Sequence, residues 1–270
     1  MNQNTAVFES MPVAQAVRKQ IVPAIASQMI ALIYNLADTY FVGMLNDPNE
    51  TAAITIVYSS FVMLTAISNL FGVGGASALS RALGGKKTED ARRIASISFW
   101  GGLGCGILFA IVFLILARPV LFLCGATRAT YETAFAYARW VVVIGGPWTI
   151  LNTLLANLVR AEGSAAQAAI GVSMGGILNI ILDPFFVLPG FLSMGAAGAG
   201  LATAVSNVAA TIYFLVYIAR NKGKSVISIS PAELRYWRQF LGPILATGFP
   251  AAVQYALTTF GSSIDYFEEN

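Results

Sequence analysis

Long unbroken runs of apolar residues recur along the chain, separated by short polar segments. Each run is long enough to cross a hydrocarbon core of roughly 30 Å as an α-helix of about 20 residues. The alternating ten-residue segments of a membrane β-barrel are absent. The pattern predicts seven membrane-spanning helices, at residues 21–45, 54–79, 94–117, 134–159, 167–190, 196–219 and 239–264.

Composition places the chain among membrane proteins. Hydrophobic residues make up 57% of the 270 residues and charged residues only 11%, whereas about a quarter of a soluble domain is charged. The first twenty residues contain Glu9, Arg18 and Lys19 but no short apolar stretch with a cleavage site, so we expect no removable signal peptide. These features predict an all-α, polytopic membrane protein.

Basic residues divide unevenly between the two sets of predicted loops. Three lie on one side, at Arg118, Arg128 and Arg139, and the other thirteen lie on the side that also holds the N-terminus. Because basic loops stay on the cytoplasmic side, we expect a multi-pass protein of the cell membrane with a cytoplasmic N-terminus. Anionic membrane lipid, and no nucleic acid, is the expected partner of these charges.

The sequence has few of the residues that form catalytic and metal sites in soluble enzymes. The chain has no histidine, which excludes His-based metal sites and Ser/His/Asp triads within it, and its two cysteines, Cys105 and Cys124, lack metal-ligand spacing. We therefore expect no enzyme, no cofactor and packing roles for both cysteines. Glycines inside two predicted spans indicate close helix contacts rather than a phosphate-binding loop; they are Gly72, Gly74, Gly75, Gly101, Gly102, Gly104 and Gly106.

Two acidic residues, Asp38 and Asp183, lie well inside predicted spans. Asp265 lies ambiguously near the chain end, and the other ten fall in loops, tails or span ends: Glu9, Asp47, Glu50, Glu89, Asp90, Glu132, Glu162, Glu233, Glu268 and Glu269. A carboxylate at that depth costs a few kcal/mol and usually faces a cavity with a function. The alternative is a neutral aspartate bonded to a neighbouring helix.

Residue counts place several polar groups at one depth. Asp38 and Asp183 each lie roughly 10 to 12 Å beneath the outer surface, and Thr203 of the next span lies at the same level. Tyr34 and Asn179 each precede an aspartate by four residues, on the same helical face, and Asn35 precedes Asp38 by three. The counts predict one polar cluster drawn from three spans.

Pro184 follows Asp183 directly and has two interpretations. Without an N–H it leaves the carbonyl of Ile180 free and disfavours helix at Asp183, as in the interrupted helices that form ion sites in secondary transporters. Alternatively it is an ordinary kink near a helix end, which Pro189 also marks.

Several segments together resemble the multidrug and toxic compound extrusion (MATE) family. In chain order they are PVAQAVRKQIVPAIASQMIALIYNLADTYFVG, SRALGGKKTEDARRIA, NLVRAEGSAAQAA, LNIILDPFF, GAAGAGLATA and GFPAAVQYALTT. The resemblance runs from about Met11 to Ile264. It implies a cation-coupled antiporter that expels amphipathic, often cationic, organic compounds from a cavity between two six-helix lobes.

The resemblance also implies a domain plan and a site. The plan is a cytoplasmic segment at 1–20, a six-helix N-lobe at 21–220, a linker at 221–238, a seventh helix at 239–264 and a tail at 265–270. The counterparts of the family's polar cluster are Tyr34, Asp38, Asn179, Asp183 and Thr203. Family members have twelve spans, so a C-terminal lobe is the missing partner, and we expect the chain alone to insert without exporting drugs.

The leading interpretation is therefore the N-terminal lobe of a MATE-type efflux transporter, not an enzyme, with Asp38 and Asp183 carrying the coupling ion. Asp38, Asn179, Asp183 and Thr203 offer oxygens that suit Na⁺, while paired carboxylates also suit a proton. Three alternatives remain: a non-transporting remnant lobe, a flippase of related two-lobed architecture, and an intramembrane aspartyl protease. The flippase is disfavoured by the absence of Lys or Arg deep in a span, and the protease by the absence of Gly-x-Gly-Asp.

Overall fold

The computed structural model describes residues 13–268, and the side chains of residues 13, 16, 19, 20 and 258–268 lie outside the description. The described elements are helices: α2 (Val13–Gly43), α3 (Pro48–Gly84), α4 (Thr88–Leu123), α5 (Tyr131–Ala138), the π-helix η1 (Arg139–Ile144), α6 (Gly146–Ala161), α7 (Ala165–Val187), α8 (Ala196–Arg220), the 3₁₀-helix η2 (Pro231–Tyr236) and α9 (Trp237–Glu268).

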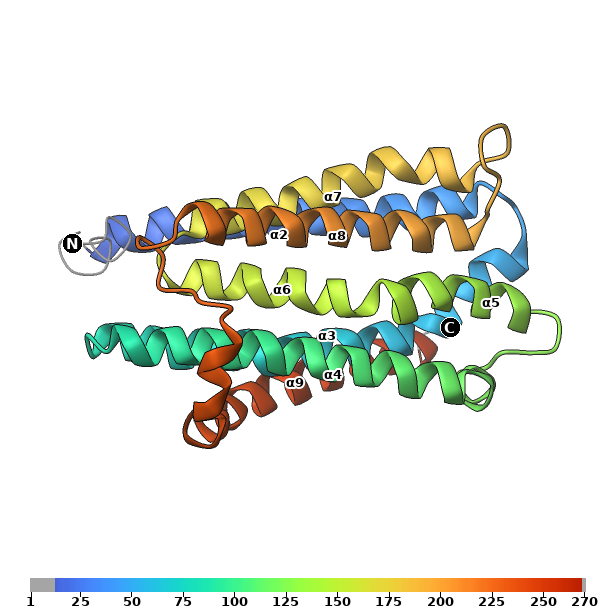
Figure 1. Cartoon of the computed structure of the whole chain (residues 1–270). Coiled ribbons are helices and arrows are strands. Elements are labelled where there is room, and N and C mark those ends of the chain that lie inside the picture. Colours follow the sequence, from blue (N-terminus) through green and yellow to red (C-terminus); the bar gives the residue numbers. More distant parts are fainter. Residues whose placement is uncertain (1–12, 269–270) are drawn as a thin grey trace.

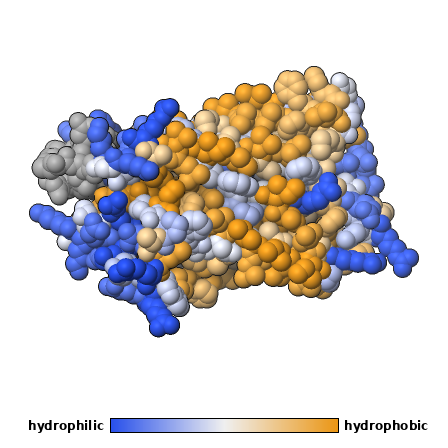
Figure 2. Space-filling model, viewed as in Figure 1, coloured by the Kyte–Doolittle hydropathy of each residue, from blue (hydrophilic) through white to orange (hydrophobic). Residues whose placement is uncertain are grey.

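The number of helices that could cross a membrane agrees with the sequence prediction. In the described part of the chain, six helices are long and apolar enough to cross a membrane, and the bent pair formed by Tyr131–Ile144 and Gly146–Ala161 makes a seventh if it crosses as one span. Figure 2 shows an apolar band across the middle of the face in view, with hydrophilic side chains at both ends. The all-α, polytopic fold class is confirmed.

The helices form an elongated bundle in two groups (Figure 1). Helices α2, α7 and α8 pack together on one side, α3, α4 and α9 on the other, and α6 lies between them and contacts both groups. One end carries the α3–α4 loop with Lys86 and Lys87 and the α8–η2 linker with Lys222 and Lys224. We call it the basic end, and the other end the far end.

Glycines allow the closest helix contacts, as predicted. A Cβ added at Gly248 of α9 would collide with the carbonyl oxygen of Leu70, and one at Gly74 of α3 would collide with that of Ile244. The two backbones can approach only because both positions lack a side chain. Of the glycines singled out in the sequence, Gly104 alone has open space around its Cβ position among described atoms.

Several boundaries differ from those expected from hydrophobicity. Helix α2 begins at Val13, well before the apolar run at Ile21, because nothing in the charged segment prevents it from continuing the helix. Helix α9 continues to Glu268 through the segment expected to be a tail, while the Asp265 side chain lies outside the described residues. The fourth span is bent by 46° where η1 meets Gly145.

Both cysteines are free and partly buried. Cys105 lies within α4, and Cys124 caps the C-terminus of the same helix. Cys105 packs against one apolar core cluster and Cys124 packs against another. Their environments agree with the packing roles expected from the sequence.

Candidate functional site

Four of the predicted polar residues meet where α2, α7 and α8 adjoin. The Thr203 hydroxyl of α8 donates to Asp38 Oδ2 of α2 at 3.4 Å. Asn179 Nδ2 of α7 lies 3.4 Å from both Asp183 Oδ1 and Thr203 Oγ1. The structure thus brings together residues from the three spans that the residue counts place at one depth.

The members of the cluster on α7 and α8 are enclosed by the helices, whereas Asp38 of α2 is partly exposed. The exposed fraction of the side chain is 0% for Asp183, 2% for Asn179 and 8% for Thr203. The two carboxyl groups are close enough to interact with each other. Ion pairs in the described part of the chain involve neither aspartate. Two like charges therefore face each other in a low-dielectric site without a basic partner, an arrangement that a proton or a cation would relieve.

Three oxygen atoms of the cluster are buried and lack a hydrogen-bond partner among described residues: Asp38 Oδ1, Asn179 Oδ1 and Asp183 Oδ2. Carboxylate, amide and hydroxyl oxygens are the ligands that hard cations prefer. The described residues include no group of three or more His, Cys, Asp or Glu that could hold a metal ion. The oxygen set thus fits a monovalent cation or a proton better than a metal such as zinc.

Tyr34 and Asn35 lie one turn before Asp38 but differ in their surroundings. The ring of Tyr34 packs near Gly176 of α7, and a Cβ at that glycine would lie 3.0 Å from the ring. The amide of Asn35 is exposed and bonds to the Ala31 carbonyl of its own helix at 2.9 Å. The structure therefore places Tyr34 beside the cluster and leaves Asn35 outside it.

Helix α7 is not interrupted at Asp183. It continues through Pro184 to Val187, and the Leu188 N–H still bonds to the Pro184 carbonyl at 3.3 Å. The expectation of an unwound helix at the aspartate is wrong, and the alternative of a proline near a helix end is what the structure shows. A proline so close to the C-terminus removes only one ladder bond, so packing against α2 and α8 is sufficient to keep the helix.

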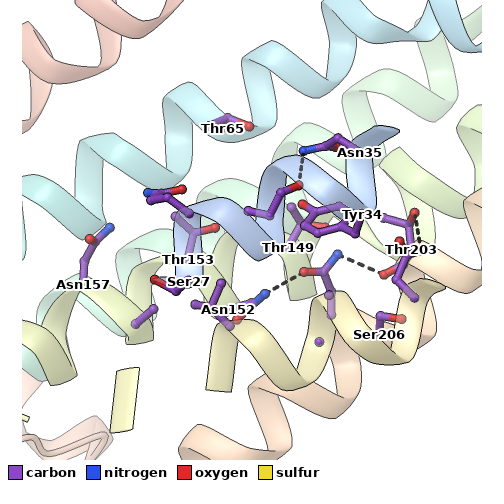
Figure 3. A pocket seen from close by; sticks show the side chains of 18 of the residues that line it. Ser27, Tyr34, Asn35, Thr65, Thr149, Asn152, Thr153, Asn157, Thr203 and Ser206 are labelled. Atoms are coloured by element: carbon purple, nitrogen blue, oxygen red, sulfur yellow. Dashed lines mark hydrogen bonds between the residues drawn. The ribbon is translucent and has the colours of Figure 1, made fainter. Parts of the chain in front are cut away.

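A cavity of about 490 Å³ extends from this cluster toward the basic end (Figure 3). Its polar lining comes from five helices and consists mainly of amides and hydroxyls: Ser27, Gln28, Asn35, Thr65, Asn69, Thr149, Asn152, Thr153, Asn157, Asn179, Thr203, Ser206 and Asn207. A second cavity of about 640 Å³ shares Tyr34 and Thr203 with it and includes Asp38. Volumes of this size hold drug-sized ligands.

Amide side chains cross-link the lining. Asn152 Nδ2 of α6 donates to Asn207 Oδ1 of α8 at 2.8 Å, and Asn207 Nδ2 donates to the Thr203 carbonyl at 2.9 Å. These two bonds join the wall of the cavity to the helix that carries Thr203. The polar cluster is consequently part of one continuous polar surface rather than an isolated pair of acids.

Two residues in this region escape sequence analysis. The predicted fourth span ends at residue 159, just before Arg160, but Arg160 lies in the last turn of α6 and lines the cavity. Glu162 was assigned to a loop, yet its side chain is only 2% exposed. Counting residues from a span end gives depth but not the direction of a side chain or the docking of a linker, so neither position could be found in that way.

Comparison with known proteins agrees with this architecture. The MatE family model matches residues 23–185. The multidrug export protein MepA of Staphylococcus aureus (strain NCTC 8325 / PS 47) is 32% identical over 253 residues, which are 94% of this chain and 55% of MepA. The chain thus spans about half the length of the curated relatives it matches.

Solved structures show the same likeness. A MATE family multidrug resistance transporter in its outward-facing conformation matches with a TM-score of 0.81 at 27% identity, over 99% of this chain and 55% of that one. An inward-facing structure of such a transporter matches with a TM-score of 0.76 at 28% identity, over 86% and 54% of the two chains. On the family model and these likenesses together, the chain belongs to the MatE family of multidrug efflux transporters.

Proposed function

We propose that this chain is the N-terminal lobe of a cation-coupled antiporter that exports amphipathic organic compounds, and that Asp38 and Asp183 carry the coupling H⁺ or Na⁺. The observation that carries the proposal is the meeting of two carboxyl groups from α2 and α7 at one depth without a basic partner. Buried carboxylates of this kind mark ion pathways in membrane proteins.

The hydrogen bonds of the cluster suit a site that binds and releases an ion. The three bonds each measure 3.4 Å, which is longer than the usual range. A bound cation or proton would draw the oxygens together and hold α2 against α7 and α8, and its release would restore the repulsion. The ion thereby biases two arrangements of the lobe, as coupling between ion and substrate requires.

Orientation and partners complete the proposal. The basic end faces the cytoplasm of the cell membrane, in keeping with the distribution of Lys and Arg. The second lobe, which the relatives possess over the other half of their length, supplies the remaining wall of the transport pathway. Substrates enter the polar cavity beside the cluster when it faces inward.

The proposal is tested in a transporter that combines this chain with a C-terminal lobe, reconstituted in vesicles under an imposed Na⁺ or H⁺ gradient. Asp38→Asn and Asp183→Asn should each abolish gradient-driven efflux while leaving insertion intact. Asn179→Ala and Thr203→Ala should weaken efflux less, because each removes a neutral ligand and no charge.

Glu132→Gln serves as the matched control, because it removes a carboxylate that is exposed at the start of α5. Its efflux should equal that of the unchanged protein at equal expression. Undiminished gradient-dependent efflux by the Asp183→Asn protein would show that the carboxyl cluster is only structural. Comparison of the two gradients identifies the coupling ion.

A further inference from the structure

Arg160 is the one basic residue among those lining the polar cavity of about 490 Å³, within the part of the chain that the structure describes. It lies in the last turn of α6, where a long side chain could extend toward the basic end and reach water. Side chains on a helix instead lean toward the N-terminus of that helix, which for α6 points away from the basic end. Its guanidinium Nη1 accordingly donates to Asn157 Oδ1, almost one turn deeper, at 3.0 Å.

The guanidinium has donors to spare. An arginine carries five N–H donors in a planar fork, and the hydrogen bond to Asn157 uses one of them. Its Nε is buried without a hydrogen-bond partner in the described structure. Ion pairs there include Arg92 and Arg93 but not Arg160. A partly buried cation with free donors is therefore directed into the cavity without a protein counter-charge.

The carboxylate nearest to Arg160 in sequence does not act as its counter-charge. Glu162 accepts hydrogen bonds from the Ser225 hydroxyl at 2.7 Å and from the Val226 N–H at 3.2 Å, so it is committed to the linker. Asp38 and Asp183 lie beyond Thr203, at the other end of the cavity. The cavity is thus polarised, with a guanidinium at the basic end and carboxyl groups at the opposite end.

We infer that Arg160, with Asn157 beside it, is a binding site for the carboxylate of an amphipathic substrate. A carboxylate matches the planar fork of arginine with two parallel hydrogen bonds. Amides along the wall, Asn69 and Asn152 among them, would solvate the rest of such a ligand. The inference rests on the proposed function in taking the cavity as the substrate route.

The test uses the 270-residue chain in lipid nanodiscs and a matched pair of dyes. Rhodamine B carries a carboxylate on a cationic ring system, and its methyl ester is the same cation without that charge. Equilibrium dialysis measures the binding of each dye, with empty nanodiscs as the blank for partition into lipid. Arg160→Gln should weaken rhodamine B binding at least about tenfold, because a charge-assisted hydrogen bond is lost, and should change binding of the ester less than about twofold.

Two further variants separate the site from general charge effects. Arg220→Gln removes an exposed arginine from the last turn of α8, and both dyes should bind to it as to the unchanged chain. Arg160→Lys keeps the positive charge but loses the planar fork of donors, so its affinity for rhodamine B should fall between that of the unchanged chain and that of Arg160→Gln. Helix content measured by circular dichroism confirms that each variant is folded.

Three outcomes would overturn the inference: no binding of rhodamine B by the unchanged chain, equal losses for both dyes in Arg160→Gln, or an equal loss in Arg220→Gln. In a chain that already carries Asp183→Asn, the change Arg160→Gln should weaken rhodamine B binding by the same factor as it does in the unchanged chain. Dye binding requires no ion gradient. A chain that binds rhodamine B through Arg160 while its two-lobed form fails gradient-driven efflux would therefore refute the proposed function and leave the carboxylate site standing.

Discussion

Glu162 fixes the linker between α8 and α9 to the bundle, and its removal should free that linker. The carboxylate accepts hydrogen bonds from the Ser225 hydroxyl at 2.7 Å, the Val226 N–H at 3.2 Å and the Tyr217 hydroxyl at 3.4 Å. In Glu162→Ala the Ser225 hydroxyl and the Val226 N–H lose this acceptor, while the Tyr217 hydroxyl keeps its bond to Ser164 Oγ at 3.0 Å. The Val226 N–H is buried, so leaving it unsatisfied costs about 1–3 kcal/mol by itself.

The expected effect is a local loss of about 2 kcal/mol, which corresponds to about a 30-fold higher population of the undocked linker. Trypsin cleavage after Lys222 and Lys224 reports that population when opening is fast compared with cleavage. Cleavage there should therefore accelerate about 30-fold in Glu162→Ala. Cleavage at Lys86, in the α3–α4 loop, should stay constant and provides an internal reference.

Glu89→Ala is the matched control, because its carboxylate belongs to an exposed pair with Arg92 at 3.9 Å. Such surface pairs contribute little to stability, so cleavage of the linker should not change. Equal cleavage rates after Lys224 in Glu162→Ala and the unchanged chain would refute the reasoning. They would mean that contacts of Trp100 and Ser96 with the end of the linker are sufficient to hold it.

Two more expectations concern stability. Burial raises the pKa of Glu162 above its ordinary value, and its hydrogen bonds oppose this only in part. As pH rises from the ordinary carboxyl range through the raised folded-state pKa, the melting temperature of the unchanged chain should therefore fall relative to that of Glu162→Gln. A melting temperature of the unchanged chain that instead rises relative to that of Glu162→Gln would contradict this sign. Gly248→Ala should lower the melting temperature in detergent, because the added methyl group meets the Leu70 carbonyl and costs about 1–3 kcal/mol. Gly104→Ala, where the space is open, should leave it equal or higher, and equal losses in both variants would contradict the proposed contact.

Depth could be predicted from the sequence because helical rise is constant. Counting residues from the loops was enough to place Asp38, Asp183 and Thr203 at one level, and four-residue spacing placed Asn179 on the same face as Asp183. The hydrogen bonds among them follow from that geometry. Orientation around each helix was constrained only by these short spacings, which do not show that the Asn35 amide bonds back to the Ala31 carbonyl of its own helix.

Features that depend on tertiary contacts could not be predicted in this way. The bend at Gly145 arises where the backbone of the fourth span closes on α8, since a Cβ there would lie 3.0 Å from that of Ala204. Local propensity likewise favoured a break at Pro184, and packing against two neighbouring helices overrides it. The place of Arg160 in the cavity lining could not be predicted either, because the sequence does not show which way its side chain leans.

Contacts with α3, and not the peptide link through the preceding linker, hold α9 in place. Gly74 and Gly248 bring the two backbones into contact, and the apolar side chains of Phe240 and Ile244 are buried in the core cluster of the bundle. A chain cut in the linker should consequently remain a single particle, whose two fragments separate on a denaturing gel but elute together from a sizing column. By its contacts, α9 belongs to the same bundle as α3 and α4.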